Sequence, residues 1–341
     1  MGTHSQAELF DAEPSPFILS LPKAELHLHL EGSMDGNTLA ELSRRHDSQP
    51  LSSEEIEQIY SYTDFSGFLL AFKAVTEHLH NADDYELLTY RLMQKLRGEN
   101  VLHAEVYVSV GVILWRGQAL EPLFDGMERG RLRGERDFGV SLYWIFDAVR
   151  HFGAAAAEGV FDLAATLRGR NVVGIGIGGD ERRAGAAIFK DLYRNARHHG
   201  LRLTAHAGET VGPESIWAAL NIGSERIGHG LNAFVDDELM NLLAERQIPI
   251  EICLTSNVRT GCLRSFSEHP VKRYFEAGLM ITLSSDDPAM FGTTCAQEYQ
   301  RVQQVFEFTD EQLRELARNS FEASFLPAQK KLEYLKMVDE V

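Results

Sequence analysis

Two histidines, His27 and His29, stand two residues apart in the apolar run AELHLHL. Side chains at positions i and i+2 of a strand point to the same face, so both imidazoles can bind one metal ion. An isolated pair of this kind is a weak indication of metal binding. Here the pair ends an apolar strand and precedes a loop that begins Glu-Gly-Ser, and barrel active sites lie at that end of the strands.

Three further segments end an apolar run with residues that can bind metal or transfer protons. In TAHAGE, His206 is followed three residues later by Glu209. In RIGHG, the glycines beside His229 allow a ligand to approach the backbone closely. In SSDDP, Asp286 and Asp287 are adjacent and point in different directions, so one can face a metal and the other a substrate.

Three histidines and an aspartate form a nitrogen and oxygen ligand set that leaves one zinc position open for water, as a catalytic site requires. Bound zinc lowers the pKa of that water to about 7. A histidine and a glutamate outside the ligand set can then move protons. Cobalt, iron or nickel can occupy the same ligands, and zinc is preferred on its frequency in such sites.

The elements that must position these residues alternate along the chain. Eight short runs rich in Val, Ile, Leu and Tyr are separated by segments with helical periodicity, which indicates parallel βα units. The predicted strands are 24–30, 104–110, 140–146, 172–177, 202–207, 225–230, 248–254 and 279–285. The predicted fold is an α/β protein, a (β/α)8 TIM barrel that forms one domain over 1–341, with an extended or helical N-terminal extension at 1–20.

Two regions exceed what a minimal barrel needs. Residues 31–101 are too many for one crossover helix, so extra helices are expected there, and 310–341 read as closing helices. Within the first region, Phe65, Phe68 and Phe72 share one helical face. Core packing is the favoured interpretation of these rings, and a substrate lid is the alternative.

Composition limits the classes of partner. The chain has 341 residues and a formal charge of −17, which disfavours nucleic acid and anionic membrane surfaces. Three cysteines without CxxC spacing, no signal peptide and no long apolar segment predict a cytoplasmic protein. A small purine nucleoside or base is the expected partner, and the sequence leaves a homo-oligomer open.

The motifs PKAELHLHLEGS, GGDE, TAHAGE, RIGHG and SSDDPAMFGTT occur in this order over residues 22–294. Together they resemble the adenosine/adenine deaminase family of the amidohydrolase superfamily, in its bacterial branch. The resemblance implies one Zn²⁺ per chain, held by His27, His29, His206 and Asp286. Zinc deaminases of the other type carry a PCxxC segment, which this sequence lacks.

The resemblance also implies roles at the base. Glu209 is expected to protonate ring nitrogen N1 while hydroxide attacks C6, and His229 to orient and help deprotonate the water. Asp287 is expected to bind N7, and the backbone N–H of Gly179 to meet N3. Protonation of N1 makes C6 electrophilic, and ammonia then leaves the tetrahedral intermediate.

Two positions depart from the adenosine branch of the family. Glu31 stands where that branch has an aspartate that contacts ribose, and Ser-Asn-Val at 256–258 stands in place of its usual segment. Both resemble bacterial branches that act on adenine or on modified adenine nucleosides, including 6-aminodeoxyfutalosine. That compound bears a carboxylated aromatic group beyond the ribose, for which Arg259 or Arg116 is a suitable partner.

The predicted function is therefore hydrolytic deamination at C6 of an adenine-type base in a nucleoside: adenosine, deoxyadenosine or a derivative such as 6-aminodeoxyfutalosine. Deamination of free adenine is the alternative. A different hydrolase of the superfamily, acting on an ester, lactone or phosphotriester, is a weaker one, and a catalytically inactive binding module is weaker still.

Other conspicuous residues have simpler interpretations. His78 and His80 form a second HxH, but on the helix predicted there their side chains diverge and cannot share a metal. Cys253 and Cys262 are interpreted as packing residues. Glu181 is either a partner that supports the site residues or an acidic residue at a helix N-terminus.

Overall fold

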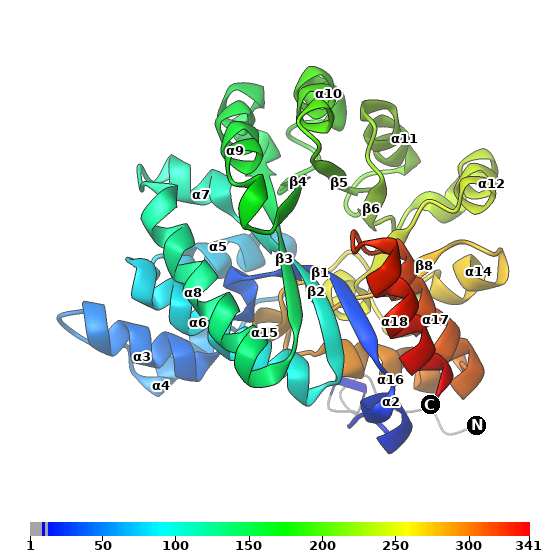
Figure 1. Cartoon of the computed structure of the whole chain (residues 1–341), viewed down its shortest axis with the longest axis horizontal. Helices are drawn as coiled ribbons and strands as arrows, with labels where there is room; N and C mark the ends of the chain where they lie inside the picture. The colour runs from blue at the N-terminus through cyan, green and yellow to red at the C-terminus, as the bar shows by residue number, and fades with distance from the viewer. Residues whose placement is uncertain (1–8, 11–12) are drawn as a thin grey trace.

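Eight parallel strands form one sheet whose order follows the chain from β1 to β8. The computed structural model describes residues 9–10 and 13–341. The strands are β1 (Lys23–His29), β2 (Val101–Val108), β3 (Ser141–Val149), β4 (Val172–Gly178), β5 (Arg202–Ala207), β6 (Arg226–His229), β7 (Ile250–Ile252) and β8 (Ile281–Leu283). All eight predicted strands are confirmed, and Figure 1 shows them at the centre of the molecule.

The sheet closes between its first strand and the residues after its last. Leu28 and Asp286 form a parallel bridge. The N–H of His29 donates to the carbonyl of Asp286 at 2.8 Å, and the N–H of Asp286 donates to the carbonyl of His27 at 3.0 Å. The predicted (β/α)8 barrel is therefore confirmed, and the closure itself brings Asp286 between the two histidines of β1.

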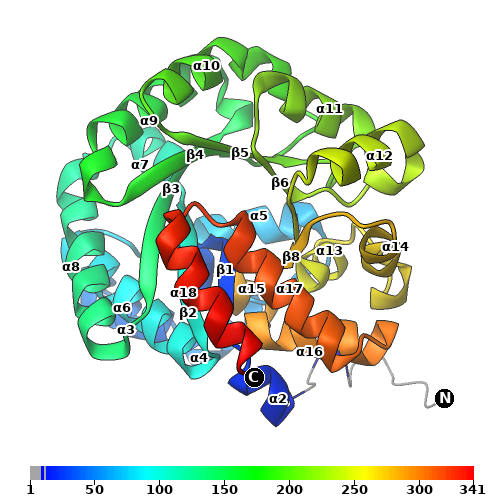
Figure 2. The same ribbon diagram turned by 45° about the vertical axis from the view of Figure 1, so that its right-hand side comes forward.

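Helices surround the strands, and Figure 2 shows α8 to α12 as successive parts of an outer ring. The helices with their bounds are α2 (Pro16–Ser20), α3 (Gly36–His46), α4 (Ser53–Ile59), α5 (Phe65–Thr76), α6 (Ala82–Gly98), α7 (Val110–Trp115), α8 (Leu120–Phe138), α9 (Ala154–Thr166), α10 (Lys190–His198), α11 (Pro213–Ile222), α12 (Asp237–Arg246), α13 (Leu254–Arg259), α14 (Val271–Glu276), α15 (Pro288–Phe291), α16 (Cys295–Phe306), α17 (Asp310–Ala323) and α18 (Ala328–Asp339).

Short 3-10 turns complete the connections. They are η1 (Glu31–Ser33), η2 (Arg150–Phe152), η3 (Arg168–Arg170), η4 (Ala186–Phe189), η5 (Ala233–Val235) and η6 (Phe266–Glu268). In the part of the chain that the structure describes, no helix combines the length and apolar character that crossing a membrane requires. Of the expected N-terminal extension at 1–20, residues 16–20 form α2, and residues 1–8 and 11–12 lie outside the described residues.

The long connection between β1 and β2 contains α3, α4, α5 and α6, so the extra helices expected at 31–101 are confirmed. Capping explains where they begin: the side chains of Asp35, Ser52, Asp64 and Asn81 each accept a backbone N–H of the first turn. The C-terminal helices expected at 310–341 are α17 and α18.

The helix predicted over His78 and His80 is wrong, because α5 ends at Thr76. His78 Nε2 lies 3.2 Å from a carboxylate oxygen of Asp47, and the ring of His80 stacks on His46 with centroids 4.3 Å apart. The two imidazoles thus have separate partners.

Strand β3 is longer than predicted. It runs to Val149, three residues beyond the predicted end at 146, and so includes Asp147. The chain there reads Phe-Asp-Ala-Val, and the acidic residue ended the apolar pattern from which the strand was predicted. This difference matters because Asp147 lines the cavity described below.

Candidate active site

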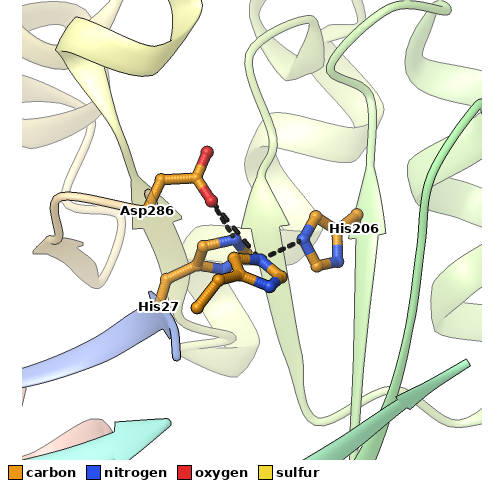
Figure 3. A group of neighbouring side chains, drawn as sticks. His27, His206 and Asp286 are labelled. Atoms are coloured by element: carbon orange, nitrogen blue, oxygen red, sulfur yellow. Dashed lines mark hydrogen bonds and ion pairs between the residues drawn. The ribbon is translucent and has the colours of Figure 1, made fainter. Parts of the chain in front are cut away.

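Four side chains from three separate parts of the barrel converge at the C-terminal ends of the strands. His27 and His29 come from β1, His206 from β5, and Asp286 follows β8. Their ligand atoms all lie within 4.8 Å of one another. Figure 3 shows His27, His206 and Asp286 directed toward a common point. The structure brings together the four residues that the sequence predicted as metal ligands.

The spacing of these atoms allows all four side chains to bind one ion. His29 Nε2 lies 3.2 Å from His206 Nε2, and Asp286 Oδ1 lies 3.4 Å from the Nε2 atoms of both His27 and His29. Two ligand atoms that each lie about 2.0–2.1 Å from a zinc ion would be at most about 4 Å apart, so these separations are compatible with a shared ion. His27 Nε2 is buried without a hydrogen-bond partner among the described residues, as expected of an atom that binds a metal.

In two of the three rings, those of His27 and His206, a neighbour holds the second nitrogen. His27 Nδ1 lies 2.6 Å from Glu251 Oε2, and Arg226 pairs with the other oxygen of Glu251 at 2.6 Å. His206 Nδ1 donates to the carbonyl of Ile177 at 3.1 Å. These contacts direct each Nε2 lone pair toward the centre. Burial lowers the pKa of His206 well below its ordinary value, which favours the neutral form that binds a metal.

Two of the site residues have left-handed backbone conformations. His229 has φ 62° and Asp286 has φ 64°, although neither is glycine. Such conformations cost about 1–3 kcal/mol each and persist where the surrounding structure enforces them. The pairing of Asp286 with β1 and the pairing of His229, the last residue of β6, with Ala207 of β5 supply that enforcement.

Glu209 lies in the loop after β5, and Glu181 determines the course of that loop. The Glu181 carboxylate accepts the N–H groups of Gly208 at 2.8 Å, Glu209 at 3.0 Å and Thr210 at 2.8 Å, and the hydroxyl of Ser215 at 2.7 Å. Of its two predicted roles, Glu181 therefore has the supporting one. Burial, with the like charge of Asp286, raises the pKa of Glu209 well above its ordinary value.

His229 is oriented by the segment Ser-Asn-Val after β7. Asn257 Nδ2 lies 3.3 Å from His229 Nδ1, and His269 Nε2 lies 3.3 Å from Asn257 Oδ1. The amide therefore directs His229 Nε2 toward the centre, 3.8 Å from Glu209 Oε2 and 3.9 Å from Asp286 Oδ2. Burial lowers the pKa of His229 to about 4, so the imidazole is neutral near pH 7.

Asp287 depends on Gly32, which follows the neighbouring strand β1. A methyl group at Gly32 would lie 1.8 Å from Asp287 Oδ1, so only glycine leaves space for this carboxyl group. Asp287 Oδ1 is buried and has no hydrogen-bond partner among the described residues. Burial, reinforced by neighbouring Asp286, raises the pKa of Asp287 well above its ordinary value. Asp287 thus offers an unpartnered polar group to a ligand.

One cavity connects the four-ligand centre with the surface. It is lined at the inner end by residues of the centre and by Glu209, His229, Asp287 and Gly179. Gly179 follows β4 and has φ 88°, a conformation that glycine adopts readily. The structure therefore brings Gly179 into the same cavity as the predicted catalytic residues.

The outer end of the cavity is aromatic. Phe65, Phe68 and Phe72 of α5 line it together with Trp115, whose ring stacks on Phe152 with centroids 5.7 Å apart. Phe68 is also buried in the hydrophobic core, whereas Phe65 and Phe72 are only partly buried. Of the three rings, only Phe68 therefore belongs to the core as the favoured interpretation has it. All three rings together form a wall of the cavity.

The two arginines considered for a substrate carboxylate lie in different places. Arg116 lines the cavity, and its guanidinium donates to the carbonyl of Thr76 at 2.7 Å and to that of Lys73 at 3.2 Å. Arg259 is not among the lining residues: its guanidinium packs 4.2 Å from the ring centroid of Phe10 and donates to a backbone carbonyl. A contact of Arg259 with the substrate stays a prediction, and Arg116 is the arginine that the cavity lining contains.

Glu31 is not among the residues that line the cavity, but it contacts Ser109, which is. Its Oε1 accepts the N–H of Ser109 at 3.0 Å, and its Oε2 is buried without a hydrogen-bond partner among the described residues. Burial raises the pKa of Glu31 to about 7. The observed contact holds the backbone after β2, and a contact with substrate remains a prediction.

Sequence reasoning missed Asp147 and Glu251. Asp147 stands just beyond the predicted end of its strand, as Asp286 does, and that position was the available signal. Glu251 interrupts the apolar run IPIEICL, and an unexplained acidic residue in a buried strand indicates a buried partner, here His27.

Comparisons with known proteins identify the family to which this chain belongs. The profile of the adenosine deaminase family matches residues 22–341. An aminodeoxyfutalosine deaminase of Streptomyces avermitilis is 38% identical over 328 residues, covering 95% of this chain and 92% of the relative.

Two solved structures extend the comparison. The crystal structure of adenine deaminase from Arthrobacter aurescens has a TM-score of 0.90 at 31% identity and covers 94% of this chain and 98% of that one. An amidohydrolase from Burkholderia ambifaria, solved with bound Zn, has a TM-score of 0.88 at 26% identity, with 96% of each chain covered. The chain belongs to the adenosine deaminase family, within the amidohydrolase superfamily.

Proposed function

We propose that the chain deaminates C6 of an adenine-type base in a nucleoside that carries a carboxylated aromatic group, of which 6-aminodeoxyfutalosine is the expected example. One observation carries this proposal: a single cavity joins the four-ligand centre to an aromatic end that contains Arg116. The relative named aminodeoxyfutalosine deaminase supports the same substrate.

We propose Zn²⁺ as the metal, one ion per chain, because three imidazoles and a carboxylate suit it and a structural neighbour contains bound Zn. Such an ion, when bound, supplies hydroxide near neutral pH and stabilises developing negative charge. Cobalt, iron and nickel are the other metals that this ligand set accepts. The cysteines of the described region are free, which supports a reducing, cytoplasmic compartment.

The protein residues have separate tasks in this reaction. Glu209, protonated through burial, donates its proton to N1, which makes C6 electrophilic. Neutral His229 orients the attacking oxygen and accepts its proton, while Asp287 hydrogen-bonds N7 and the N–H of Gly179 donates to N3. After the oxygen has bonded to C6, His229 passes its proton to the amino group, the C6–N bond breaks and ammonia leaves, and the proton of the C6 hydroxyl returns to Glu209 as the 6-oxo product forms.

Free adenine is the second candidate, since a close structural neighbour is an adenine deaminase. The inner end of the cavity contains every residue that we assign to the base. Adenine alone, however, would leave the phenylalanines of α5 and Arg116 without a ligand. The aromatic end therefore favours the extended nucleoside.

The test is product formation by the purified protein loaded with zinc. We expect ammonia and the 6-oxo nucleoside, identified by mass spectrometry, from 6-aminodeoxyfutalosine and more slowly from adenosine. The Glu209→Gln variant serves as a control for contaminating deaminases. Ammonia release from adenine alone, with both nucleosides unchanged, would contradict the proposal.

A further inference from the structure

Asp147 is a buried acidic residue that the proposed reaction does not use. It lies near the C-terminal end of β3, is 5% exposed, and lines the cavity. Its Oδ1 is buried and has no hydrogen-bond partner among the described residues. A buried polar atom without a partner is costly in a folded protein, which indicates that a ligand supplies the partner.

The neighbouring strand makes room for this carboxyl group. Asp147 pairs with Gly176 of β4. A methyl group at Gly176 would lie 2.7 Å from Asp147 Oδ1, and one at Gly178 would lie 2.7 Å from Asp147 Oδ2. The carboxyl group therefore occupies space that two glycines leave open on the inner face of β4, and a larger residue at either position would displace it.

Gly178 lies close both to Asp147 and to the four-ligand centre. A methyl group at Gly178 would also lie 3.3 Å from His206 Cε1, so Asp147 and the metal ligand His206 flank one glycine. The next residue, Gly179, is the one that we assign to N3 of the base. Asp147 thus lines the cavity beside Gly178, the residue before the glycine that we assign to N3.

The substrate has few hydrogen-bond donors left for this location. In the proposed arrangement N1, N7 and N3 have partners, and C6 faces the metal centre. N9, which carries the sugar, is joined to N3 through C4, so the sugar begins next to Gly179. A sugar hydroxyl is then the nearest donor to Asp147.

We propose that Asp147 accepts a hydrogen bond from a sugar hydroxyl of the nucleoside and thereby selects nucleosides over the free base. This inference rests on the proposed function. Hydrogen bonds to charged or buried polar groups change affinity by about 10- to 100-fold, so removal of either partner has an effect of that size.

The experiment compares kcat/KM for adenosine, 2′-deoxyadenosine, 3′-deoxyadenosine and adenine in the wild type and in Asp147→Ala. In the wild type, one of the two deoxynucleosides is expected to react about 10- to 100-fold less well than adenosine. In Asp147→Ala, kcat/KM for adenosine is expected to fall to that lower value, and kcat/KM for the same deoxynucleoside should show no further loss. The value for adenine should not change.

Controls separate a sugar contact from a structural role. Asp147→Asn retains an oxygen acceptor and is expected to recover part of the lost kcat/KM and part of the discrimination; it also serves if the alanine variant fails to fold. Asp162→Ala removes an exposed aspartate of α9 and should match the wild type. Zinc content, measured by elemental analysis, should stay unchanged in Asp147→Ala.

Two results would overturn the proposal: undiminished discrimination between adenosine and both deoxynucleosides in the Asp147 variants, or an equal loss for adenine and all nucleosides. The substrates that the wild type converts test the proposed function separately. If it converts adenine but none of the nucleosides, the proposed function fails, and the role of Asp147 fails with it.

Discussion

The two ends of the cavity are built in different ways. At the inner end, the histidines of β1, β5 and β6 and the aspartate after β8 are fixed by strand pairing and by contacts with Glu251 and Asn257. His229 and Asp286 also have left-handed backbone conformations. At the outer end, side chains of α5 and α7 form an apolar wall, and the guanidinium of Arg116 is its main charged group beside Lys73.

The difference teaches where chemistry and selectivity reside. A reaction needs its groups within fractions of an ångström, and pairing between strands supplies that accuracy. Substrate choice needs shape and a few contacts, which helices inserted between β1 and β2 can supply without disturbing the barrel. Changes at the inner end should therefore reduce activity on every substrate, and changes at the outer end should reduce it selectively.

Removal of the metal should have the largest effect and act on all substrates alike. Chelation is expected to lower kcat by about 10⁴-fold, because the hydroxide source and the electrostatic stabilisation are lost together. Added Zn²⁺ or Co²⁺ should restore activity, with metal content followed by elemental analysis. A metal-free protein with full activity would contradict the assignment of the four ligands.

Glu209→Gln should lower kcat by about 10³-fold for every substrate, because the amide cannot donate the proton to N1. Zinc content should stay at the wild-type level, since Glu209 is outside the ligand set. Steady-state kinetics and elemental analysis check both points. An unchanged kcat would remove Glu209 from the reaction.

Gly32→Ala tests the inner end without touching a reacting group. The added methyl group would lie 1.8 Å from Asp287 Oδ1, so the carboxyl group must move. A displacement of about 1 Å at a positioned group costs about 100-fold in kcat/KM. We expect that loss for adenine and for nucleosides alike; a loss confined to nucleosides would show that Asp287 contacts the sugar instead of the base.

Arg116→Ala should affect the outer end alone. We expect KM for 6-aminodeoxyfutalosine to rise about 30-fold through loss of a charge-assisted hydrogen bond, with KM for adenosine unchanged. Because Arg116 also binds the carbonyls at the end of α5, the thermal unfolding midpoint should be measured as well. The matched variant Arg259→Ala should leave both KM values unchanged. If KM for 6-aminodeoxyfutalosine rose in Arg259→Ala and not in Arg116→Ala, Arg259 would be the partner of the substrate carboxylate.

Phe72→Ala should have the smallest effect. Loss of one aromatic contact is expected to raise KM for the extended nucleoside by about 10-fold, with little change for adenosine or adenine. A comparable rise for adenine would indicate that the α5 wall contacts the base, and the two ends would not be separate.

The inner end was predictable from the sequence because each strand presents its functional residues within a few positions of its own end. His27, His206, His229 and Asp286 each end or follow an apolar run, and parallel strands bring such ends together. Asp147 was missed because its own charge ended the pattern by which β3 was predicted.

The outer end was not predictable in the same way. Helical periodicity shows that Phe65, Phe68 and Phe72 share a face, but which surface that face meets depends on how α5 packs on the barrel. Residue type likewise made Arg116 and Arg259 equivalent. Only the fold places Arg116 in the cavity and Arg259 against Phe10.

The most direct test of the account is the ratio of kcat/KM for 6-aminodeoxyfutalosine to that for adenine in the zinc-loaded wild type. The contacts of the outer end should make this ratio at least about 100, with adenosine between the two substrates. A ratio of one or less would contradict the central claim, because the aromatic wall and Arg116 would then contribute nothing to the choice of substrate.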